Sequence, residues 1–93
     1  MEAVKQQPQV DLGEIRRVYD EHEVRTATYL GRDLNESERV NLGIDGLAEV
    51  WKVELRPIAD FEQASEVMAE KIRAGETVGA AIENAIRSLD QEA

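Results

Sequence analysis

The apolar residues between Asp60 and Leu89 recur every three or four positions, and this spacing constrains the fold more than any other feature of the chain. In the first part of this stretch they are Phe61, Ala64, Met68 and Ile72. In the second part they are Val78, Ala81, Ile82, Ala85, Ile86 and Leu89. Because residues at these intervals share one face of an α-helix, the pattern predicts two amphipathic helices.

The segment between these helices carries a stop signal followed by a start signal. Gly75 is suited to end a helix, and Thr77 is suited to cap the next one. Asp60, with Gln63 at the capping-box position, predicts the start of the first helix. We therefore expect a C-terminal helical hairpin, 60–74 and 77–90, in which the two apolar stripes pack together within a mainly α-helical fold.

The 93 residues are enough for one small domain, which we place at residues 10–93. Residues 1–9 show no periodicity and are predicted to be a flexible N-terminus. Asp11 and Glu14 form a capping-box pattern that starts a helix reaching Glu23 or Val24. Residues 24–30 fit either a continued helix or a strand, because β-branched residues alternate there while the apolar stripe also continues.

The middle of the chain predicts a second capped helix followed by an ambiguous segment. Asn35 and Glu38 form the cap, and the glycines at 43 and 46 favour a break there because each costs about 1 kcal/mol inside a helix. Residues 47–56 fit a helix somewhat better than a strand. The alternation from Trp51 to Leu55 keeps a short strand at 50–56 open.

No pattern in the sequence predicts a catalytic, cofactor or metal site. The chain has no cysteine, which excludes thiolate zinc ligands and cysteine nucleophiles. The single histidine, His22, lacks partner ligands and is expected at the surface or at an interface. A calcium-loop interpretation from Asp33 fails because Glu38 and Ile44 fall where glycine and glutamate are required. We therefore expect a protein that is not an enzyme.

The charge balance fits either a surface that only keeps the protein soluble or an acidic face that docks on a basic partner. Twenty acidic and eleven basic residues give a net charge of −9, which repels nucleic acid and favours a partner with a basic surface. A non-enzymatic adaptor, regulator or inhibitor is the preferred function, of the kind found among phage or plasmid accessory proteins. The residues expected to bind the partner are Glu62, Glu66, Glu70, Glu83 and Trp51.

The last helix also predicts self-association. Gly79, Ala80, Ala81 and Ala85 form a small-residue face on which another helix can approach closely, and with the apolar stripe this is more surface than one neighbouring helix covers. A homodimer would bury this surplus. No segment is long and apolar enough to span a membrane and residues 1–10 lack a signal-peptide pattern, so we expect a cytoplasmic location.

A family resemblance supplies an alternative function. The alternating segment Trp51 to Pro57, a following helix, and the segment Gly75 to Arg87 resemble the ribbon-helix-helix family of Arc-type repressors and antitoxins over residues 50–90. The resemblance implies a dimer whose paired strands enter the major groove of DNA. It also implies that Lys52, Glu54 and Arg56 read the bases.

Overall fold

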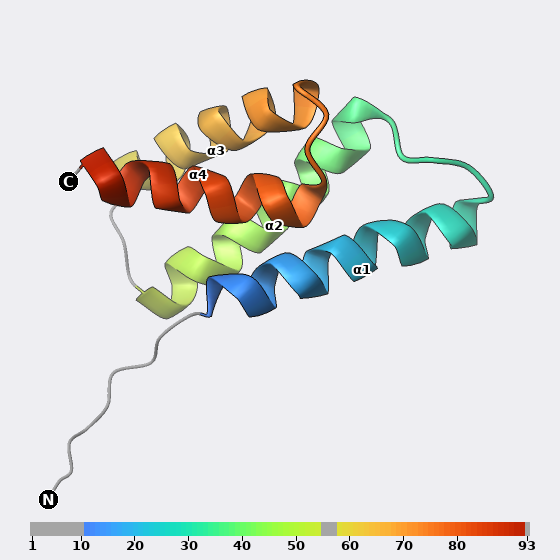
Figure 1. Ribbon diagram of the computed structural model, residues 1–93, viewed down its shortest axis with the longest axis horizontal. Coiled ribbons are helices and arrows are strands. Elements are labelled where there is room, and N and C mark those ends of the chain that lie inside the picture. Colours follow the sequence, from blue (N-terminus) through green and yellow to red (C-terminus); the bar gives the residue numbers. More distant parts are fainter. Residues whose placement is uncertain (1–10, 55–57, 93) are drawn as a thin grey trace, which may run out of the picture.

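A computed structural model describes residues 11–54 and 58–92 of the chain. These residues form four helices, α1 (Leu12–Leu30), α2 (Glu36–Glu54), α3 (Ile58–Arg73) and α4 (Val78–Glu92) (Figure 1). Since the described ranges contain no strand, the predicted mainly α-helical fold with a C-terminal helical hairpin is confirmed. The predicted flexible segment 1–9 lies outside the described residues.

Three of the four predicted helix caps are formed, those at Asp11, Asn35 and Thr77. The Asp11 carboxylate accepts a hydrogen bond from the Glu14 backbone N–H at 3.2 Å. Asn35 and Glu38 exchange two bonds, both 2.9 Å long, which is a complete capping box. The fourth prediction is wrong, because α3 begins at Ile58 and Asp60 lies inside its first turn. There its negative charge still faces the positive end of the helix dipole.

The first helix is longer than predicted, because residues 24–30 are helical rather than extended. The Thr28 hydroxyl donates to the Val24 carbonyl at 3.0 Å, a bond that β-branched threonine forms readily within a helix. Gly31 ends the helix with a φ of 74°, and its N–H bonds to the Ala27 and Thr28 carbonyls. The end of α1 is therefore fixed by its left-handed glycine and not by the β-branched run.

The predicted break between Gly43 and Gly46 is wrong, because α2 runs through both glycines. Both lie where α2 crosses another helix. A Cβ at Gly43 would overlap the side chain of Met68 on α3, and one at Gly46 would overlap Ile82 on α4. The glycines are therefore sites of close helix approach, and packing outweighs their low helix propensity. Residues 47–54 are also helical, so the strand alternative at 50–56 is wrong as far as Glu54.

Helix α4 lies at the centre of the fold and packs against α1, α2 and α3 (Figure 1). Its apolar residues are almost completely buried, namely Val78, Ala81, Ile82, Ala85 and Ile86. They join Met68 and Ile72 of α3 in one core, with Phe61 and Leu89 packed against its edge, which confirms the predicted contact between the stripes.

The small-residue face of α4 is already covered within the same chain. Gly79 and Ala80 are buried, and a Cβ on Gly79 would overlap the backbone carbonyl of Arg16 on α1. Because this face contacts α1, the surplus surface expected to drive dimerisation is absent from this part of α4. The homodimer stays a prediction, but the small-residue face of α4 no longer supports it.

Candidate interaction surface

Helix α1 packs against the rest of the fold mainly through its N-terminal half. None of its residues is fully buried, and those that touch the core, Leu12, Ile15 and Tyr19, all precede residue 20. The C-terminal turns extend past the start of α4 (Figure 1). We call residues 24–30 the α1 arm.

The α1 arm carries all three large hydrophobic side chains that are exposed in the described part of the chain. Val24 is 66% exposed, Tyr29 is 89% exposed and Leu30 is 41% exposed. Because an α-helix turns about 100° per residue, these three side chains point to different sides of the arm and do not form one patch. Three exposed apolar side chains on one short projecting segment nevertheless favour a site that another molecule covers.

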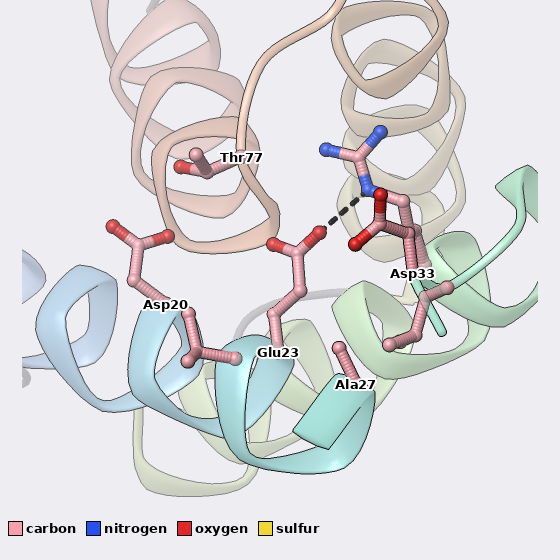
Figure 2. A pocket seen from close by; sticks show the side chains of 8 residues that line it. Asp20, Glu23, Ala27, Asp33 and Thr77 are labelled. Atoms are coloured by element: carbon pink, nitrogen blue, oxygen red, sulfur yellow. Dashed lines mark hydrogen bonds and ion pairs between the residues drawn. The ribbon is translucent and has the colours of Figure 1, made fainter. Parts of the chain in front are cut away.

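The base of the arm is fixed to the start of α4 by acidic side chains. The Asp20 carboxylate accepts from the Gly79 N–H at 2.9 Å, and the Glu23 carboxylate accepts from the Val78 N–H at 3.1 Å. Figure 2 shows both carboxylates pointing from α1 toward the end of α4 that carries Thr77. These two acids satisfy N–H groups that the first turn of a helix leaves without intrahelical partners. Their role is therefore structural.

A hollow of about 500 Å³ lies between the α1 arm, the start of α2 and the start of α4 (Figure 2). We call it the arm hollow. Its lining residues are Asp20, Glu23, Val24, Ala27, Asp33, Leu34, Arg39 and Thr77. Three carboxylates and one guanidinium give this lining a net negative charge.

The charged groups of the arm hollow are not equivalent. Arg39 donates to Glu23 at 2.7 Å and also to the Glu76 carbonyl, so its charge is matched inside the protein. Among the described residues, no side chain or backbone group pairs with the carboxylate of Asp33. Asp33 is therefore the acid in this hollow that is available to a ligand.

A second, smaller hollow of about 250 Å³ lies between the α1 arm and α2. Leu30, Leu34 and Leu42 supply its apolar lining, and Glu38 and Asp45 add acidic groups. Leu34 lines both hollows, so the α1–α2 connection is flanked on two sides by apolar and acidic surface.

The connection between α1 and α2 is held by one ion pair with two hydrogen bonds. The Arg32 guanidinium donates to both carboxylate oxygens of Glu38, each at 2.8 Å. This pair, together with the Asn35 N–H, lowers the pKa of the Glu38 carboxyl from its usual 4.5 to about 2. The loop that borders the arm is thereby tied to the first turn of α2.

We expect the stabilisation that Glu38 provides to be lost in acid. Its pKa is lower in the folded chain than in the unfolded chain, so the contribution is complete above pH 4.5 and disappears as the pH falls through about 2. An NMR titration of the Glu38 carboxyl carbon should give a midpoint near 2. Arg32→Gln should raise that midpoint, and an unchanged midpoint would contradict the assigned cause.

Of the five residues predicted to bind a partner, three are exposed in the structure and two are buried. Glu62, Glu66 and Glu70 are exposed on α3, as expected. Glu83 was expected to be exposed, and this is wrong. It is only 9% exposed and bonds to Arg87 and Arg16, which lower its pKa. It lies on the α4 face that α1 covers.

Trp51 was also expected to bind the partner, but its side chain is buried. Its ring is 8% exposed and meets the Phe61 ring edge-on, with the ring centres 5.6 Å apart. The ring lies in the core between α2 and α3, and the predicted role of Trp51 in partner binding stays a prediction.

The residues of the DNA-binding alternative lie at and beyond the end of α2. Lys52 is exposed and lies 3.9 Å from the Glu49 carboxylate, and Glu54 is the last residue of α2. Arg56 lies outside the described residues. The extended conformation that the ribbon-helix-helix resemblance implies is not seen at 50–54, and DNA binding stays a prediction.

The single histidine of the chain lies at the surface. His22 is exposed and stacks on Tyr19, with ring centres 5.8 Å apart. Within the described residues no three side chains of the metal-binding types lie together. In the same part of the chain, no helix has the length and apolar character needed to cross a membrane.

Comparisons with protein families, with curated proteins and with solved structures find no match to this chain. Its function is therefore inferred from the surface just described. The sequence prediction missed the α1 arm because Tyr29 and Leu30 continue the apolar stripe of α1, and a stripe normally predicts burial. The one indication in the sequence was that no other apolar segment was left to pack against this end of the helix.

Proposed function

We propose that this chain is a non-enzymatic protein-interaction module, an adaptor, regulator or inhibitor, that binds a protein partner through the α1 arm. One observation carries the proposal: Val24, Tyr29 and Leu30 are exposed together on a segment that projects from the fold. Burying three such side chains against a partner is favourable, at about 25 cal/mol per Å² of apolar surface removed from water.

The charge of the chain supports a partner with basic character. The net charge is −9, and three hollows with acidic groups in their linings border the arm. Complementary charge of this kind steers the encounter and orients the partner, while the apolar contacts supply most of the affinity. The exposed acids Glu62, Glu66 and Glu70 on α3 contribute to the long-range field.

Site-specific photo-crosslinking in the cell that expresses the protein tests this proposal. A photoreactive phenylalanine replaces Tyr29, whose 89% exposure makes the substitution harmless to the fold. A matched variant carries the same group at Gln63, an exposed position on α3. We expect one discrete product with a second protein from position 29 and none from position 63.

Two results would contradict the proposal. Equal labelling from both positions would show that the arm is not a preferred contact. A product from position 29 with twice the mass of the chain would show that the arm binds a second copy instead. In the supporting case, the variant Tyr29→Ser should weaken partner binding while its thermal unfolding midpoint stays nearly unchanged, because the Tyr29 side chain is 89% exposed.

A further inference from the structure

We propose that the arm hollow receives a cationic side chain, lysine or arginine, of the protein partner. This inference rests on the proposed function and specifies the chemistry of the contact. It assigns the charged end of that side chain to Asp33 and its aliphatic stem to the apolar wall formed by Val24, Ala27 and Leu34.

The first support is the unequal use of the acids around the hollow. Asp20 and Glu23 are committed to the N–H groups of α4, and Glu23 also bonds to Arg39. Asp33 has no such commitment within the described residues and lines the same hollow. An uncompensated carboxylate beside two matched ones favours an incoming cation over an anion or a neutral group.

The second support is the combination of apolar and acidic lining. Lysine and arginine have long aliphatic stems with a charge at the end, so they bind best where an apolar wall leads to a carboxylate. Val24, which is 66% exposed, provides such a wall at the open side of the hollow. The volume of about 500 Å³ is ample for one such side chain.

The test uses a capped synthetic helical peptide of leucine, glutamine and arginine, and a matched peptide with glutamate in place of arginine. Binding is followed by backbone NMR shifts of the full chain at low salt. We expect the arginine peptide to shift the signals of the α1 arm and of residues 33–34. The glutamate peptide should leave these signals in place. A shift pattern centred on α3 would overturn the inference.

Two variants that each remove one negative charge separate a specific contact from general attraction to a negative protein. Asp33→Asn should weaken binding of the arginine peptide by about fivefold, the upper end for a single partly exposed ion pair. Glu62→Gln removes one exposed charge on α3 and should leave the affinity unchanged. Because the Asp33 carboxylate has no partner among the described residues and Asp33→Asn keeps the backbone carbonyl that accepts from Arg32, the substitution should not alter the thermal unfolding midpoint.

Equal weakening by both variants would overturn the inference, since it would show that only net charge matters. Such a result leaves the crosslinking experiment at position 29 unaffected, because that experiment depends on the arm and not on the charge of the partner. The failure of this inference is therefore distinguishable from a failure of the proposed function.

Discussion

Replacing Ile82 by aspartate is expected to destabilise the fold by at least about 4 kcal/mol. Ile82 has no exposed surface and packs from α4 against α2, where a Cβ on Gly46 would already overlap it. The described core around Ile82 consists of apolar side chains, so a carboxylate there must either remain charged in that core or take up a proton. Since small domains are stable by only about 5–15 kcal/mol, this loss removes a large part of the free energy of unfolding and should lower the urea midpoint strongly.

Urea unfolding followed by circular dichroism measures this effect. Ile82→Val is the packing control, which removes one methylene and should cost only about 1 kcal/mol. Gln63→Asp, at an exposed position of α3, is the surface control and should change stability by less than about 0.5 kcal/mol. If Ile82→Asp unfolded at the wild-type midpoint, Ile82 could not be in the core and the arrangement of α4 would be wrong.

The sequence predicts the C-terminal hairpin well because the signals for its helices and for the turn between them agree. The apolar spacing, the glycine stop at Gly75 and the Thr77 cap all point to the same two helices. In the structure Gly75 has a φ of 105°, and the Thr77 hydroxyl accepts from the Ala80 N–H at 3.2 Å. Agreement between local and long-range preferences is what makes a segment predictable.

Predictions from the sequence fail where the environment of a residue is set by a neighbour that is distant along the chain. Gly43 and Gly46 have low helix propensity, yet their lack of a side chain is what allows α3 and α4 to approach α2. Nothing within a few residues of either glycine indicates that contact. The same reason explains Glu83, whose acidic character predicts exposure until Arg16 of α1 is placed beside it.

The candidate surface was predictable only in part. A net charge of −9 correctly indicates acidic faces, and the exposure of Glu62, Glu66 and Glu70 is confirmed. The α1 arm depends on how far α1 extends beyond its neighbours. That extension is set by the position of Gly31 relative to the start of α4, a three-dimensional relation that spacing along one helix does not contain.

Replacing Gly79 by alanine is expected to cost about 3 kcal/mol, although alanine is the better helix former by about 1 kcal/mol. The added Cβ would overlap the backbone carbonyl of Arg16 and lie 2.6 Å from a carboxylate oxygen of Asp20. Backbone atoms move only if the whole helix moves, so α1 must separate from α4. That movement also breaks the Asp20 bond to the Gly79 N–H and leaves a partly buried donor unsatisfied.

Gly43→Ala is the matched control for this prediction, because the same atom is added at another helix crossing. There the overlap is with the end of the Met68 side chain, which is flexible and can move aside, so the cost should be near ~1 kcal/mol or less. Urea midpoints of the two variants should therefore differ clearly, with Gly79→Ala the less stable. The reverse order would show that α1 does not lie against α4 at this point, and the α1 arm would then lose its fixed base.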